Sequence, residues 1–130
     1  MNLESPKVTV EKPAQYIFDQ LSNVQNFEKL MPDNIAKFEV TGEDSFVFAL
    51  KGMPEIKLRT KEKTAPSRII LGAASDKLPF TLTGNINAVS ESSSEVQLKF
   101  DGEFNAMMAM MIKGPISKFI ETLAANMHKL

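Results

Sequence analysis

Apolar residues follow two different spacings along this chain. In residues 35–104 apolar and polar residues alternate, which is the period of a strand with one buried face. After this region, and between the first strand and it, apolar residues recur every three or four positions, as they do in an amphipathic helix. The pattern therefore predicts a central sheet that is flanked in sequence by helices.

The N-terminal part predicts one short strand and two short helices. Residues 7–10 (Lys-Val-Thr-Val) favour a strand, and Lys12-Pro13 ends it and places a proline at the first turn of a helix. Helical spacing then runs over residues 14–21 and again over residues 24–31, separated by Ser22-Asn23. We expect the second helix to end at Pro32-Asp33-Asn34.

Five turn signals divide the central region into six strands. The turns are expected at residues 42–44, 52–54, 65–67, 75–77 and 90–94. The alternation assigns a set of apolar side chains to the buried face: Phe46, Phe48, Leu50, Ile56, Leu58, Phe80, Leu82, Ile86, Val96, Leu98, Phe100 and Phe104. Both faces are apolar in residues 68–74, so the pattern leaves the orientation of that strand open.

The C-terminal segment, residues 105–130, predicts one long amphipathic helix. Its apolar stripe consists of Met108, Ile112, Pro115, Ile116, Phe119, Leu123, Met127 and Leu130. Gly114-Pro115 predicts a bend or a break, because a proline inside a helix removes one hydrogen bond. The fold class expected is α+β, with a curved antiparallel sheet of about seven strands around this helix.

Four methionines lie at the start of that helix: Met107, Met108, Met110 and Met111. Met108 belongs to the apolar stripe and Met111 flanks it, whereas Met107 and Met110 point about 140–160° from its centre. Three partners for them stay open: the two short helices, a second copy of the chain in a homodimer, or a ligand beneath a lid.

Composition narrows the classes of function. A length of 130 residues predicts a single domain over residues 1–130, and a net charge of −1 argues against nucleic acid as a partner. The longest apolar run, residues 106–112, is too short to span a membrane. We expect a cytoplasmic location, since residues 1–10 lack the pattern of a secretion signal and the chain has no cysteine.

Candidate catalytic chemistry is sparse. The only histidine, His128, falls on the polar side of the last helical turn, and the carboxylates are scattered over turns and polar faces. We therefore expect no catalytic residue, no metal and no cofactor. Glu62 is the exception, because the alternation of Ile56, Leu58 and Thr60 would place it on the buried face. It is either the rim of a strand end or, with Thr60, a polar anchor at the mouth of a pocket.

The order of these elements resembles the helix-grip fold of the START and pollen-allergen superfamily, often called SRPBCC. Residues 12–23, residues 27–32 (Phe-Glu-Lys-Leu-Met-Pro) and residues 111–120 carry the resemblance, which covers essentially the whole chain. The Leu30-Met31-Pro32 turn followed by a strand is most similar to the small bacterial branch that holds coenzyme Q-binding proteins and relatives of the small G-type component of carbon monoxide dehydrogenase.

The resemblance implies a pocket between the sheet and the final helix. The walls that the pattern provides are mostly apolar, so we expect a small hydrophobic partner such as a lipid, a quinone or a polycyclic compound. The expected ligand-binding residues are Phe46, Phe48, Ile56, Leu58, Thr60, Glu62, Phe80, Leu82, Met108, Met111, Ile112 and Phe119.

Two other functions stay open beside ligand binding. The resemblance allows an enzyme of the polyketide cyclase or dehydratase kind, which would need a shielded acid or base, and Glu62 is the only candidate. The chain could also be a protein-interaction module whose interior is filled by phenylalanine and methionine, with residues 107–111 as the contact surface.

Overall fold

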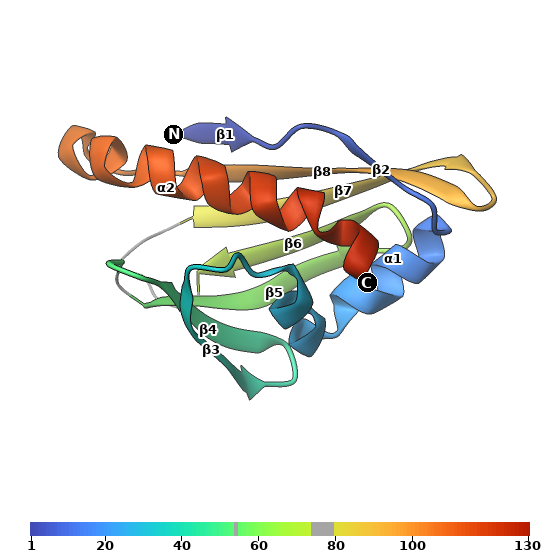
Figure 1. The fold of residues 1–130 in the computed structure, drawn as a ribbon, viewed down its shortest axis with the longest axis horizontal. Coiled ribbons are helices and arrows are strands. Elements are labelled where there is room, and N and C mark those ends of the chain that lie inside the picture. Colours follow the sequence, from blue (N-terminus) through green and yellow to red (C-terminus); the bar gives the residue numbers. More distant parts are fainter. Residues whose placement is uncertain (54, 74–79) are drawn as a thin grey trace.

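A computed structural model describes residues 1–53, 55–73 and 80–130. An antiparallel sheet curves around one long helix (Figure 1). In chain order the elements are β1 (Asn2–Glu4), β2 (Val8–Val10), α1 (Ala14–Ser22), the 3-10 helix η1 (Val24–Leu30), β3 (Ile35–Gly42), β4 (Ser45–Leu50), β5 (Ile56–Thr64), β6 (Arg68–Ala73), β7 (Phe80–Ser90), β8 (Ser93–Gly102), α2 (Ala106–Ala125) and the 3-10 helix η2 (Met127–Lys129).

The strand order is β1-β8-β7-β6-β5-β4-β3, and β2 also pairs with β8. The α+β helix-grip architecture is confirmed, with the six predicted strands of the central region present as β3 to β8. The strand β1 was not predicted, because Asn2–Glu4 holds a single apolar residue and shows no period. The turn predicted at residues 75–77 and Pro54 of the turn at 52–54 lie outside the described residues.

Ser5 joins β1 and β2 along the edge of β8. Its side chain is buried, with 2% exposure. The Ser5 amide donates to the Leu98 carbonyl at 2.8 Å, and the Ser5 hydroxyl oxygen accepts from the Leu98 amide at 2.9 Å. The hydroxyl thus replaces a backbone partner at the point where the N-terminal strand is interrupted.

The concave face of the sheet carries the core. Ile69 and Leu71 of β6 are buried there, which settles the orientation that the sequence left open. The second half of α2 covers this face, and the ring of Phe119 stacks on Phe48 with centroids 4.7 Å apart and an interplanar angle of 7°. The helices α1 and η1 close the end of the sheet near the C-terminus (Figure 1).

The helix α2 runs through Gly114 and Pro115 without interruption, so the break predicted there is wrong. Pro115 is also exposed, which removes it from the predicted stripe, and Ile120 is buried instead. Water can hydrogen-bond to a carbonyl freed by a proline on the exposed side, and such a helix persists. The α-helix ends before the predicted residue 130.

Strand β5 contains an irregularity that turns Glu62 outward. The pairing passes from Thr60 opposite Leu71 to Glu62 opposite Ile70, so one extra residue is inserted at Lys61. A bulge of this kind shifts the alternation by one position. Glu62 is exposed, and its predicted place on the buried face is therefore wrong. Thr60 stays on the inner side, and its Oγ1 is buried with no hydrogen-bond partner among the described residues.

The Ser5→Ala variant is expected to lose about 1–3 kcal/mol of unfolding free energy, because the buried Leu98 amide loses its acceptor. Urea unfolding followed by circular dichroism measures the loss. Ser117→Ala, at a half-buried serine of α2, is the control and should change stability by less than about 0.5 kcal/mol. Equal stability of the two variants would contradict a structural role for the Ser5 hydroxyl.

The Thr60→Val variant is expected to gain about 1 kcal/mol of unfolding free energy, because a methyl group of similar shape replaces an unpaired buried hydroxyl. The same substitution at exposed Thr64, the last residue of β5, is the matched control and should be nearly neutral. A loss of stability at Thr60 alone would mean that the hydroxyl has a partner, and the prediction would then fail.

Candidate ligand-binding site

A cavity of about 60 Å³ lies between the concave face of the sheet and α2. Every side chain that lines it is apolar: Phe48, Met53, Ile56, Leu58, Phe80, Leu82, Phe100, Phe104, Met108, Ile112, Ile116, Phe119 and Ile120. We call this space the apolar cavity. An enclosed site with such walls favours an apolar guest, because a polar group would lose its hydration without gaining a partner.

The walls are built by the two periods of the sequence. Side chains two residues apart on β5, β7 and β8 point to the same face, and side chains three or four apart on α2 face them. Phe80, Phe100 and Phe104 form an aromatic row, with centroids 5.2 and 6.2 Å apart. Gly102 permits this row, because a Cβ there would lie 3.1 Å from the Cβ of Phe80 and would also meet the Phe104 ring.

Most of the predicted ligand-binding residues line the apolar cavity, and their role in binding stays a prediction. They are Phe48, Ile56, Leu58, Phe80, Leu82, Met108, Ile112 and Phe119. Phe46 is buried outside the cavity, where it stacks on Phe27 with centroids 5.2 Å apart. Thr60 and Glu62 do not line it, and Met111 is 68% exposed.

Sequence reasoning missed five lining residues: Met53, Phe100, Phe104, Ile116 and Ile120. Phe100, Phe104 and Ile116 were already assigned to buried faces, so a wider choice along the same pattern would have included them. Ile120 lies beside the predicted stripe. Met53 belongs to the connection between β4 and β5, where no period indicates the direction of a side chain.

A second hollow, of about 590 Å³, lies beside the apolar cavity. We call it the polar groove; it is lined by Pro32, Asn34, Leu50, Lys51, Gly52, Met53, Gly114, Pro115, Lys118, Phe119 and Thr122. Met53 and Phe119 line both spaces. The apolar cavity and the polar groove are therefore neighbours that share these two side chains.

The charged side chains that line the polar groove are Lys51 and Lys118, and its described lining includes no carboxylate. Glu55, which follows the groove residue Met53 closely in the chain, is engaged elsewhere: its Oε1 accepts a hydrogen bond from Lys37 Nζ at 2.9 Å. This hydrogen bond and the charge of Glu55 raise the pKa of Lys37. The charge that the groove offers is thus positive.

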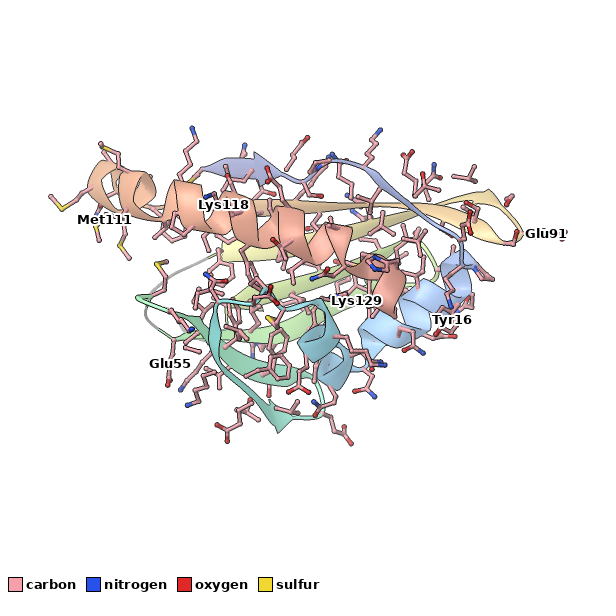
Figure 2. The ribbon with its side chains drawn as sticks, viewed as in Figure 1. Tyr16, Glu55, Glu91, Met111, Lys118 and Lys129 are labelled. Atoms are coloured by element: carbon pink, nitrogen blue, oxygen red, sulfur yellow. The ribbon has the colours of Figure 1, made fainter. Side chains whose placement is uncertain are left out.

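The methionines at the start of α2 are divided between two environments. Met108 lines the apolar cavity, whereas Met107, Met110 and Met111 are 74%, 83% and 68% exposed. The first turns of α2 extend beyond the ends of the strands, and Met111 lies on this overhang (Figures 1 and 2). The short helices α1 and η1 lie toward the other end of α2, so the expectation that they cover the exposed methionines is wrong.

Titratable chemistry is remote from the cavity walls. His128 is exposed, and its Nδ1 lies 2.8 Å from the Ala125 carbonyl oxygen. Within residues 1–53, 55–73 and 80–130, no three His, Asp or Glu side chains are grouped so that they could hold a metal ion. None of the helices in this part of the chain is long and apolar enough to cross a membrane.

Comparison with solved structures finds the same fold at low sequence identity. A START superfamily protein from Mycobacterium smegmatis matches with a TM-score of 0.72 and 14% identity, over 98% of this chain and 94% of its own. Norcoclaurine synthase from Thalictrum flavum, in complex with dopamine and hydroxybenzaldehyde, has a TM-score of 0.73 and 11% identity, over 99% of this chain and 84% of its own.

A third similar structure is the di-domain ARO/CYC BexL from the BE-7585A biosynthetic pathway, with a TM-score of 0.66 and 14% identity over 97% of this chain. The match covers 46% of BexL, so this chain spans about half the length of that protein. No protein-family model matches the chain, and no curated protein matches it in sequence.

Identities of 11–14% establish a shared fold and leave the ligands of these proteins their own. The narrower similarity to the bacterial branch of coenzyme Q-binding and carbon monoxide dehydrogenase-related proteins stays a prediction. The expected architecture is confirmed: this chain has the helix-grip fold of the START superfamily and of the aromatase/cyclase-type proteins.

Proposed function

We propose that this protein binds a small hydrophobic molecule, or the hydrophobic part of a larger one, in the apolar cavity. The observation that carries the proposal is the lining, in which every described side chain is apolar and the sheet and α2 contribute opposite walls. Each Å² of apolar surface that a guest removes from water stabilises the complex by about 25 cal/mol. The norcoclaurine synthase of the same fold, which was solved with two small aromatic molecules, supports a ligand at this type of site.

The cavity must widen to admit such a guest, because about 60 Å³ is far below the roughly 300–1,000 Å³ of typical ligand pockets. Two features of the structure support widening. Met53 and Met108 are unbranched and can change rotamer at little cost. In addition, no residue of α2 before Ile116 is buried, so the first half of the helix can move without disturbing the core under its second half.

The apolar walls favour a lipid, a quinone or a polycyclic compound over a sugar or a nucleotide. A cyclase or dehydratase would need a shielded acid or base, and the one candidate, Glu62, is exposed. No specific observation therefore favours the enzyme over the binding protein.

A second candidate function, contact with another protein surface, is favoured by the three exposed methionines of the overhang. Met107, Met110 and Met111 occupy neighbouring positions on the first turns of α2, where exposed methionines adapt to varied apolar partners. A second copy of this chain is the partner proposed for them.

The ligand proposal is tested by comparing Ile112→Trp with Met111→Trp. Ile112 lines the cavity and Met111 does not, so the larger side chain should fill the space only in the first variant. We expect quinones, fatty alcohols and polycyclic compounds to raise the melting temperature of the wild type and of Met111→Trp, and affinity to fall at least about tenfold in Ile112→Trp. Absence of any shift across such a hydrophobic panel would contradict ligand binding.

The homodimer is tested by light scattering during size-exclusion chromatography. The wild type should elute with the mass of two chains, and Met110→Glu should elute with the mass of one, because a buried charge at the contact disfavours association. Val89→Glu, at a hydrophobic residue that is 61% exposed on β7, is the matched control and should leave the dimer intact. A wild type that stays monomeric at high concentration rules the homodimer out.

A further inference from the structure

We propose that the ligand is an anionic amphiphile whose apolar part occupies the apolar cavity and whose carboxylate or phosphate head group lies in the polar groove between Lys51 and Lys118. This inference rests on the proposed function and narrows the chemical class of the ligand.

The first argument is the position of the two spaces. The apolar cavity and the polar groove share Met53 and Phe119, so a molecule that extends past these side chains occupies both. Met53 has three rotatable side-chain bonds and is only partly buried, so it can swing aside at the boundary. A ligand that ends inside the cavity would have to be very small, given its volume of about 60 Å³. A slim chain that continues into the groove fits the two volumes better than a bulky ring system.

The second argument is the charge of the groove. Lys51 lies in the connection after β4, and Lys118 lies on α2, so the two ammonium groups come from the sheet side and the helix side of the same hollow (Figure 2 labels Lys118). The ion pairs found in the described part of the chain are made by other lysines: Lys7, Lys37, Lys63 and Lys99. Lys51 and Lys118 therefore keep their charges available for a bound anion.

Nearby carboxylates do not neutralise the groove. Glu55 is paired with Lys37, whose Nζ lies 2.9 Å from its Oε1. Asp33 stands between the groove residues Pro32 and Asn34 in the chain, but its own side chain is not part of the lining. A cationic or neutral head group would gain nothing from the two lysines, whereas an anion would gain two attractive contacts.

The third argument is how the groove suits a charged group. Asn34 and Thr122 add neutral hydrogen-bond donors beside the two ammonium groups. Lys51 and Lys118 are exposed, so the head group keeps contact with water and avoids the large cost of burying a charge. Gly114 contributes open space, since a Cβ built on it would meet no atom within 4 Å.

The experiment uses four ligands with the same ten-carbon chain: decanoate, decyl phosphate, 1-decanol and decyltrimethylammonium. Each is titrated, below the concentration at which it forms micelles, into protein whose methionine methyl groups carry ¹³C. The Met53 and Met108 signals report on the cavity, and those of exposed Met107 and Met110 report on non-specific association. We expect the two anions to bind roughly tenfold more tightly than 1-decanol, and the cation to bind more weakly than 1-decanol.

Matched variants assign the effect to the groove. Lys51→Met and Lys118→Met should each weaken binding of the anions about threefold, and the double variant about tenfold, without changing the affinity for 1-decanol. Lys113→Met removes the same charge from α2 at a residue outside the groove lining, and it should bind all four ligands as the wild type does. Added salt should reduce the advantage of the anions over 1-decanol in the wild type.

The outcomes separate this inference from the proposed function. Equal affinity for decanoate, decyl phosphate and 1-decanol, or equal losses in Lys113→Met and Lys118→Met, would overturn the anionic head group and leave hydrophobic binding in place. Shifts of Met107 and Met110 without shifts of Met53 and Met108 would overturn both. A preference for either anion that the two groove lysines control supports the inference, and the tighter of the two identifies the head group as carboxylate or phosphate.

Discussion

The stacking of Phe119 on Phe48 is the contact on which the arrangement of this protein depends. It joins the middle of α2 to the concave face of the sheet with the rings 4.7 Å apart. From this contact toward the C-terminus, α2 carries the buried side chains Ile120 and Leu123 and seals the core. Toward the N-terminus only Ile116 is buried, and the helix leaves the sheet incompletely covered. The same contact therefore ends the filled core and begins the apolar cavity, since Phe119 lines the cavity as well.

The two halves of α2 thus serve different purposes. The second half provides stability, because its buried face packs against strands that are themselves held by long antiparallel pairings. The first half bears the half-buried Met108 and Ile112 on one side and the exposed Met110 on the other. A segment with few buried contacts opens at a lower free-energy cost than the core does. Placing the loosely packed half over the cavity gives a ligand a way in that does not require unfolding of the domain.

Much of the fold and part of the site followed from the spacing of residues. Alternation predicted the strands and the inward direction of Phe48, Leu58 and Leu82, because the strand period has only two faces to choose from. The same rule failed at Glu62, where one inserted residue in β5 reverses the alternation. It also could not separate Phe48, which lines the cavity, from Phe46, which packs on Phe27, since both are inward residues of one strand.

The sequence by itself determined which side chains are buried, the apolar nature of the cavity walls, the balance of charge and the helix-grip order of elements. The tertiary structure decided where the buried faces part to form a cavity and which methionines stay exposed. It also brought Lys51 and Lys118, which belong to a strand connection and to a distant helix, to one groove. The physical reason is that periodicity records the burial of each residue relative to its own element. The volume left between two elements, and the side chains that meet across it, depend on the curvature of the sheet and on where the helix crosses it.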